Sequence, residues 1–318
     1  MAIIAGIDEA GYGPFLGPLV ITAVVFEVHD SLGDKDLWRL LDGAVASRPR
    51  GSGPRIVVGD SKRLYSRKRG LGRLEEGVLA FQWLLGDKVS SFQDLLGSLN
   101  CFDLGNLKSY PWYQQKDLDL PITYPRVEIN NHSSLLKEVL SSKRVRFLGA
   151  RSIALSPKEF NEQLAQGYNK ALLLFKNCAN LLSTLWEDYG RLEAFCGKHG
   201  GRNRYSTLLS HAFQGSAVEA FSEGNPLSCY EIRSGDKKMR VSFIKSAEES
   251  HFPVALASMY CKYLRELFLK LFNKYWQEKL PGLRPTAGYP MDARRFLKNI
   301  DKVKVSLRIS DEILVRNR

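Results

Sequence analysis

Two adjacent carboxylates, Asp8 and Glu9, stand between an apolar stretch and a glycine-rich turn. Neighbouring side chains in a regular strand point to opposite faces, so both can serve one site only where the strand ends. The following Ala10-Gly11 indicates such an end. Two carboxylates brought together repel each other unless a cation lies between them. The pair therefore predicts a site for hard divalent ions such as Mg²⁺ or Mn²⁺, which promote attack on phosphodiesters. A capping aspartate beside a solvated glutamate is the competing interpretation.

A second acidic pair, Glu248 and Glu249, precedes Pro253, where a long helical pattern begins. These two carboxylates are either part of a site or charges that complement the helix dipole. Basic residues in a glycine-rich loop, 197–205, have a composition suited to phosphates. They are Lys198, Arg202 and Arg204. Lys62 is either a phosphate contact or a solvated lysine.

The charge balance indicates the kind of partner. The chain has 318 residues, a net charge of +12 and 44% hydrophobic residues. A basic excess favours nucleic acid, and next an anionic membrane surface or an acidic protein. The five cysteines form no CxxC pair, which predicts neither a zinc site nor a disulfide framework and suits a reducing cytosol. No apolar run approaches a membrane span. We expect a cytoplasmic monomer that binds nucleic acid and no membrane.

The elements that would position these residues form an α/β pattern. Apolar β-branched stretches predict strands at 2–7, 19–28, 144–155, 191–196 and 238–247. The stretch 56–64 predicts a short buried strand that leads into a polar turn. Helical periodicity predicts helices at 34–50, 72–86, 157–188, 206–213 and from Pro253 onward. Ser156 and Pro157 form a good helix start. Strands that come first and then alternate with helices predict a sheet with helices packed on it.

We expect residues 1–275 to form one catalytic domain, with an irregular insertion at about 87–133. Residues 276–318 are expected to form a C-terminal extension that closes the substrate cleft.

The stretch GIDEAGYGPFLGPLV, which begins at Gly6, resembles the N-terminal signature of type 2 ribonuclease H, G-[IV]-D-E-A-G-R-G-P-[LV]-x-G-P-[LV]-V. Four further blocks resemble family motifs in the family's order. They are GDSKRL (59–64), FCGKHGGRNRY (195–205), SAEESHFPVALASMYCKYLRE (246–266) and AGYPMDARRFL (287–297). The resemblance implies an RNase H-like fold: a mixed five-stranded sheet flanked by helices, with a C-terminal helical extension. Residues 87–133 match no family motif.

The resemblance also implies an activity. The family cleaves RNA in RNA/DNA hybrids and nicks 5′ to single ribonucleotides in duplex DNA. It uses two divalent metals, Mg²⁺ or Mn²⁺, held by an Asp-Glu-Asp-Asp set. Asp8 matches the aspartate that bridges both metals, and Glu9 matches the glutamate ligand.

The other two acidic positions depart from the family pattern. Gly197 stands where the third carboxylate is expected and offers no ligand. Glu193 is about 13 Å back along the strand, and the imidazole of His199 is a poor ligand for Mg²⁺. The fourth position corresponds to Glu249, with Glu248 beside it as a spare carboxylate.

The substrate-binding positions are partly altered. Gly11-Tyr12-Gly13 corresponds to a Gly-Arg-Gly turn that reads the ribonucleotide, so Tyr12 replaces a phosphate clamp with a stacking surface. Tyr289 matches the tyrosine that packs on the sugar, and its alternative is a buried turn tyrosine. Ser61 and Lys62 match the family's D-S-K segment.

Three functions are consistent with these residues. The first is an endoribonuclease on hybrids or ribonucleotide-containing DNA, weakened or inactive because of Gly197. The second is a non-catalytic nucleic-acid binder with the same fold. The third is an RNase H-fold nuclease with an altered substrate, such as a DNA junction resolvase.

Overall fold

The structure is a computed structural model that describes residues 1–30, 32, 36–48, 55–66, 68–86, 89–101, 110–114 and 117–317. The predicted insertion at 87–133 and the predicted helix at 34–50 therefore lie partly outside the described residues.

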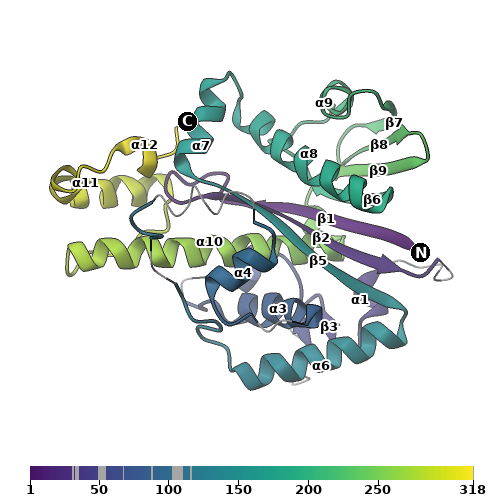
Figure 1. Ribbon diagram of the computed structural model, residues 1–318, viewed down its shortest axis with the longest axis horizontal. Helices are drawn as coiled ribbons and strands as arrows, with labels where there is room; N and C mark the ends of the chain where they lie inside the picture. Colours follow the sequence, from purple (N-terminus) through teal and green to yellow (C-terminus); the bar gives the residue numbers. More distant parts are fainter. Residues whose placement is uncertain are drawn as a thin grey trace.

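A mixed sheet forms the centre of the molecule (Figure 1). Within the described residues it has seven strands, in the order β5-β2-β1-β6-β9-β8-β7, and β3 pairs with β4 in a separate ribbon. The strands are β1 Ala2–Ala10, β2 Leu19–Val28, β3 Val45–Ala46, β4 Ile56–Val57, β5 Val145–Leu155, β6 Arg191–Gly197, β7 Ala217–Glu223, β8 Leu227–Ser234 and β9 Lys237–Ile244. Strands β1, β6 and β9 are parallel, and the other neighbours in this sheet are antiparallel.

Helices cover the sheet on two sides. They are α1 Leu37–Leu40, α2 Ser61–Leu64, α3 Gly72–Gln82, α4 Phe92–Ser98, α6 Arg126–Ser142, α7 Pro157–Ala165, α8 Lys170–Tyr189, α9 Ser206–Ala212, α10 Phe252–Lys279, α11 Pro290–Ser306 and α12 Asp311–Leu314. Short 3₁₀ turns lie at η1 Trp83–Leu85 and η2 Ala247–Glu249. None of these helices combines the length and apolar character needed to cross a membrane.

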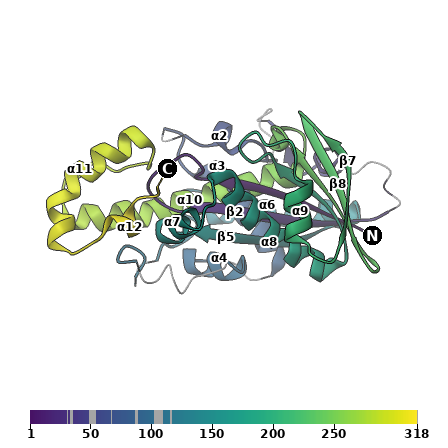
Figure 2. The same ribbon diagram turned by 90° about the horizontal axis from the view of Figure 1, so that it is seen from above.

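The layers follow from where the apolar side chains point. Along β2, Val20, Val24 and Phe26 enter the core on the α10 side, while Ile21 and Val25 enter the core on the α8 side. A strand buried on both faces reads as a continuous apolar run, as β2 does. Helix α10 packs on β1 and β2, with α3 and then α6 beyond it, and α7, α8 and α9 lie on the opposite face (Figure 1). Helices α11 and α12 lie at one end, far from β7 and β8 (Figure 2).

The mixed sheet with flanking helices confirms the expected α/β class. The strands expected at 2–7 and 19–28 are present as β1 and β2, which pair antiparallel. The predicted helix start is also confirmed, because Ser156 and Glu159 form a reciprocal capping box at α7. Helix α10 passes through residue 276 without a break, and the division into domains at that position stays a prediction.

Several expected elements are wrong. β1 does not end after Ile7; it continues to Ala10 because that residue still pairs with Val20. The single helix expected over 157–188 is two helices, since Gly167 has a φ of +91° between them. Within the described part of 34–50, only α1 is helical. The sheet also exceeds the five expected strands, because β7 and β8 add a hairpin beyond β9.

Candidate active site

The ends of β1 and β6 bring the acidic pair, Asp8 and Glu9, close to Gly197. The two strands are parallel, with Ile7 opposite Cys196, so Asp8 stands level with Gly197. A Cβ at position 197 would lie 3.5 Å from Oδ1 of Asp8 and 4.0 Å from Oε2 of Glu9. Both carboxylates therefore reach the same point although β1 is still regular there.

The close approach of α10 to β1 sets the orientation of Asp8. A Cβ on Gly6 would lie 2.2 Å from the backbone of Pro253, so only glycine allows the helix to lie this close. One turn further along α10, Ser258 forms a side-chain hydrogen bond with Asp8. The Oγ atoms of Ser258 and Ser61 are 3.0 Å apart in a buried pair. Ser61 thus contacts Asp8 through Ser258, and its role in substrate binding stays a prediction.

The two buried carboxyls at this point resist ionisation. Burial raises the pKa of Asp8 to about 7, and the negative charge of Glu248 adds to this increase. The hydrogen bond from Ser258 lowers the pKa but does not cancel the effect of burial. Burial and the neighbouring Asp8 raise the pKa of Glu9 well above its usual range. The Lys62 ammonium lowers the pKa of both carboxyls but does not offset their burial. Lys62 is therefore near the acidic pair, and its contact with a substrate phosphate stays a prediction.

The structure places Glu248, and not Glu249, beside the acidic pair. Glu248 is close enough to raise the pKa of both Asp8 and Glu9. The Glu249 side chain is 51% exposed, and its Oε1 accepts a 2.9 Å hydrogen bond from Nη2 of Arg63. Glu249, the expected fourth ligand, thus makes a surface ion pair. Glu248 lies nearer the acidic pair, because the 3₁₀ turn η2 directs the two side chains differently.

The donor set fits a hard divalent cation. It consists of carboxylate oxygens, which such ions prefer, and its buried charges lack a full counter-charge. The fit is incomplete: among the described residues, no group of three or more His, Cys, Asp or Glu side chains forms a ready metal site. Gly197 contributes no carboxylate at the point where Asp8 and Glu9 meet.

A buried arginine holds the glycine-rich turn after β1. Nη2 of Arg265 donates to the carbonyl oxygens of Leu16, at 3.4 Å, and Ala287, at 3.0 Å. Gly11 has a φ of +95°, and a Cβ there would lie 2.9 Å from Nε of Arg265. The amide of Phe15 donates to the carbonyl of Gly288 at 2.7 Å. The turn and the GYP segment are therefore fixed to each other through α10.

Sequence reasoning missed Arg265 and Ser258. Both lie in the block SAEESHFPVALASMYCKYLRE, whose apolar residues define the buried side of α10. A charged residue within an apolar helical stripe was the available signal, since such a residue is rarely buried unless it has partners. The serine carried no such signal.

Tyr289 and Lys62 line one cavity of about 530 Å³ beside the acidic pair. The Tyr289 side chain is 52% exposed, which excludes the alternative of a buried turn tyrosine. Lys262, Arg284, Glu266 and Asp292 line the same cavity.

Tyr12 lies on the other side of the sheet, toward α8. It lines an open cavity of about 550 Å³ with Arg202 and His199. Burial and the Glu9 carboxylate raise the pKa of Tyr12. Tyr12 and Tyr289 therefore do not share a cavity.

The three basic side chains of the glycine-rich loop point to different parts of the surface. Nζ of Lys198 donates to Oδ1 of Asn203 at 2.6 Å and to Oγ of Ser228 at 3.2 Å, so it ties the loop to β8 and away from the acidic pair. Arg202 faces the Tyr12 cavity, and Arg204 is exposed on the loop.

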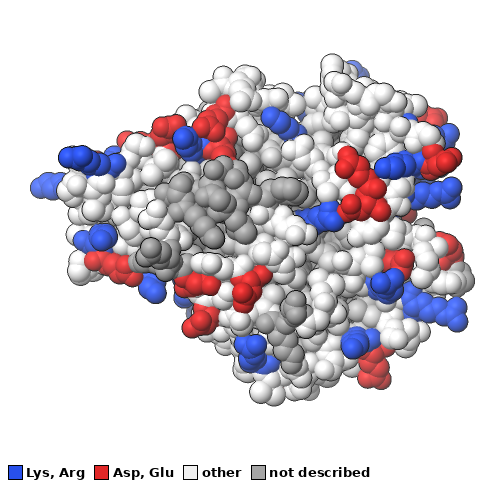
Figure 3. Space-filling model, in the orientation of Figure 1, with Lys and Arg blue, Asp and Glu red and all other residues white. Residues whose placement is uncertain are grey.

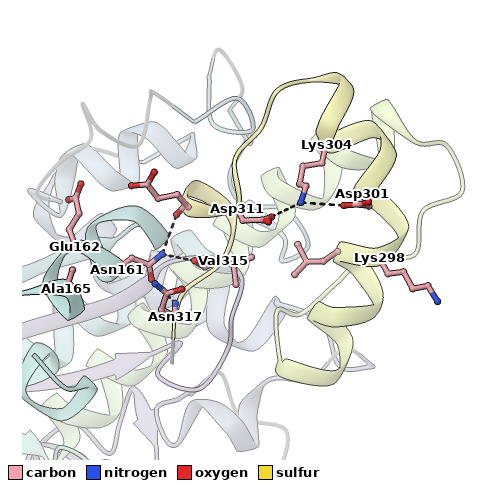
Figure 4. Close-up of a pocket in the computed structure, with 11 residues that line it drawn as sticks. Asn161, Glu162, Ala165, Lys298, Asp301, Lys304, Asp311, Val315 and Asn317 are labelled. Carbon is pink, nitrogen blue, oxygen red and sulfur yellow. Dashed lines mark hydrogen bonds and ion pairs between the residues drawn. The ribbon is translucent and has the colours of Figure 1, made fainter. Parts of the chain in front are cut away.

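Other surfaces bring no predicted site residues together. The face in Figure 3 shows Lys and Arg interspersed with Asp and Glu, without a continuous basic patch. A cavity of about 650 Å³ lies between α7 and the C-terminal helices (Figure 4). In this cavity the Lys304 ammonium forms ion pairs with the carboxylates of Asp301 and Asp311.

No protein-family model and no curated protein matches the chain. Among solved structures, a chain of the PCNA:RNase HII complex from Archaeoglobus fulgidus is 19% identical, with 99% of this chain and 94% of that chain covered and a TM-score of 0.46. Ribonuclease H2 from Pyrococcus horikoshii OT3 is 15% identical, with 98% and 92% covered and a TM-score of 0.45. Bst-RNase HIII in complex with Mn²⁺ is 12% identical, with 99% and 66% covered and a TM-score of 0.39. The chain is thus similar, along almost its whole length, to solved structures of RNase HII and RNase HIII.

Proposed function

We propose that this protein is a metal-dependent nuclease of the type 2 ribonuclease H kind. It acts on the RNA strand of RNA/DNA hybrids or at ribonucleotides in duplex DNA, with an activity limited by Gly197. The observation that carries the proposal is the convergence of Asp8 and Glu9 on the Cβ position of residue 197. Buried carboxylates that lack counter-charges are the arrangement that a divalent cation stabilises.

Each residue of the site has a role in this proposal. When bound, Mg²⁺ or Mn²⁺ supplies charge stabilisation at the phosphodiester and an activated water. Asp8 and Glu9 hold the cation, with Glu248 as the third carboxylate. Ser258 fixes the rotamer of Asp8 through its hydrogen bond, and Ser61 supports Ser258. Lys62 adds positive charge next to the substrate phosphates.

Recognition of the ribose rests on the turn and on Tyr289. A Cβ on Gly13 would meet no atom within 4 Å, so a substrate reaches this backbone directly. Backbone groups that approach a 2′-hydroxyl separate RNA from DNA. The exposed ring of Tyr289, held on the first turn of α11, offers a surface for the sugar.

The test compares cleavage of three labelled substrates: an RNA/DNA hybrid, a duplex with one ribonucleotide, and an all-DNA junction. Each is incubated with Mg²⁺ and, separately, with Mn²⁺, and Asp8→Asn is the inactive control. We expect slow, metal-dependent products from the first two substrates only. A folded protein that gives no product with either metal contradicts the proposal, and junction cleavage alone assigns a different substrate.

A non-catalytic nucleic-acid binder is the second candidate. Gly197 favours it, together with the incomplete metal site of the described residues. Salt-dependent binding of the hybrid without any turnover, in wild type and in Gly197→Asp, would select this function. Turnover by the wild type excludes it.

A further inference from the structure

A second, open cavity lies on the α8 side of the sheet, where Tyr12 is close enough to Glu9 to feel its charge. Its volume is about 550 Å³, and it lies between the glycine-rich turn, the start of α8 and the loop after β6. The lining residues are Tyr12, Asn169, Lys170, Ala171, His199, Gly200, Gly201 and Arg202.

The lining of this cavity is electropositive. Among the described residues that line it there is no Asp or Glu, whereas Lys170 and Arg202 are both cations. The 20-residue helix α8 begins here, with Asn169 as its N-cap, and the positive end of its dipole faces the cavity. The Tyr289 cavity, in contrast, includes Glu266 and Asp292.

One buried donor in the wall has no hydrogen-bond partner within the described residues, the Nε of Arg202. The His199 ring, 2% exposed, lies beside it and hydrogen-bonds Cys178. Because buried donors are almost always paired with protein, water or a ligand, the Arg202 guanidinium is suited to bind a ligand that enters the cavity.

The wall is tightly packed, and its opening is accessible. A Cβ on Gly200 would lie 3.2 Å from both the Tyr12 hydroxyl and Cβ of Ala171, so the loop, the ring and the helix start are in contact. A Cβ on Gly201 would meet no atom within 4 Å, which leaves the backbone open to a ligand. A packed wall that holds an unpartnered arginine nitrogen beside open backbone suits an anion.

We propose that this cavity binds a backbone phosphate of the nucleic-acid strand that crosses the acidic pair, and that the Tyr12 ring stacks on the adjoining nucleotide. Lys170, Arg202 and the start of α8 recognise the phosphate, and the base rests on the aromatic face. The inference rests on the proposed function, because the strand must continue to Asp8 and Glu9. Free phosphate has the same chemistry, and the experiment separates the two sources.

The experiment measures hybrid binding in EDTA by fluorescence anisotropy over a range of KCl concentrations. The test protein is the double variant Lys170→Gln/Arg202→Gln. The control is Arg146→Gln/Lys158→Gln, which removes the same charge from exposed positions that do not line the cavity. Loss of one phosphate contact lowers the slope of log K against log salt by about 1. We expect this decrease in the test variant and none in the control.

Tyr12 is tested separately by Tyr12→Phe and Tyr12→Ala. We expect phenylalanine to preserve hybrid affinity and alanine to weaken it about tenfold, because stacking needs a ring and no hydroxyl. Equal losses in both variants would overturn the stacking role.

A phosphate titration followed on the His199 ring by NMR distinguishes the ligand sources. Shifts that saturate, with displacement by the hybrid, support the strand. Shifts from inorganic phosphate with an unchanged salt slope in the double variant overturn the inference in favour of free phosphate. If wild type binds and cleaves hybrid while the double variant matches the control, this inference fails and the proposed function stands. If wild type binds no nucleic acid, both fail.

Discussion

The Cβ position of Gly197 lies 3.5 Å from Oδ1 of Asp8, at ordinary van der Waals distance. An aspartate there would add a carboxylate to the one point that both acids of β1 approach. The backbone of Gly197 does not lie in the left-handed region, so an aspartate fits without strain.

We expect Gly197→Asp to raise the rate of hybrid cleavage about 100-fold or more, because the cation gains a ligand. Without metal, the added charge should lower Tm, and Mn²⁺ should restore it. Rates in both metals and thermal melts with EDTA measure these effects. Gly197→Asn is the control, since it has the same shape without the charge. An equal gain in the control would contradict the metal interpretation.

Glu248 and Glu249 should differ when each is changed to glutamine. We expect Glu248→Gln to raise the Mn²⁺ concentration required for half-maximal cleavage by about tenfold or more, because this carboxylate acts on Asp8 and Glu9. Glu249→Gln removes one exposed ion pair with Arg63 and should change stability by less than about 1 kcal/mol. Metal titrations of the cleavage rate measure both, and the opposite order would restore Glu249 as the ligand.

Asp8→Asn should stabilise the metal-free protein and abolish cleavage. Burial makes the Asp8 charge unfavourable, and asparagine retains an acceptor for Ser258. At pH 8 in EDTA, we expect Tm to rise by about 2 °C or more. Calorimetry measures this rise. A decrease in Tm would show that the carboxylate charge is compensated in the folded protein.

The two glycines of the turn should respond differently to alanine. Gly11→Ala places a Cβ 2.7 Å from the carbonyl of Pro18 at a φ of +95°, and we expect a loss of about 1–3 kcal/mol. Gly13→Ala meets no atom and should leave urea unfolding unchanged. If the substrate backbone approaches Gly13, the same variant weakens hybrid binding. Unaltered binding would place the substrate elsewhere.

Asp292 should make the folded protein sensitive to acid. Burial acts to raise the pKa of Asp292, but Arg295, the Ala287 amide and Thr286 together lower it from 3.8 to about 2. Allowing for solvent screening, the depressed pKa contributes about 1 kcal/mol above pH 4, and this is lost as the pH falls through 2. Urea unfolding gives the free energy of unfolding of wild type and of Asp292→Asn. The difference in this free energy between the two proteins should be smaller at pH 2.5 than at pH 5. A constant difference would contradict this pKa.

Local patterns were sufficient for much of the architecture. The apolar run of β2, the capping box at Ser156 and the long stripe of α10 each depend on residues close in sequence, so each was predictable. The β8–β9 hairpin was missed even though Gly235-Asp236, between Ser234 and Lys237, is a two-residue turn signal. The end of β1 was misplaced because pairing with β2 extends the strand beyond its apolar residues.

The sequence by itself determined the residues available for chemistry: the acidic pair, the glycine at position 197, the tyrosine at position 12 and the basic loop. Only the tertiary structure decided which of them meet. It selected Glu248 over Glu249, turned Lys198 toward β8 and separated Tyr12 from Tyr289, because each side chain's direction depends on strand register and on the turn at η2. Register and packing join residues far apart in the chain, and no local pattern encodes those distances.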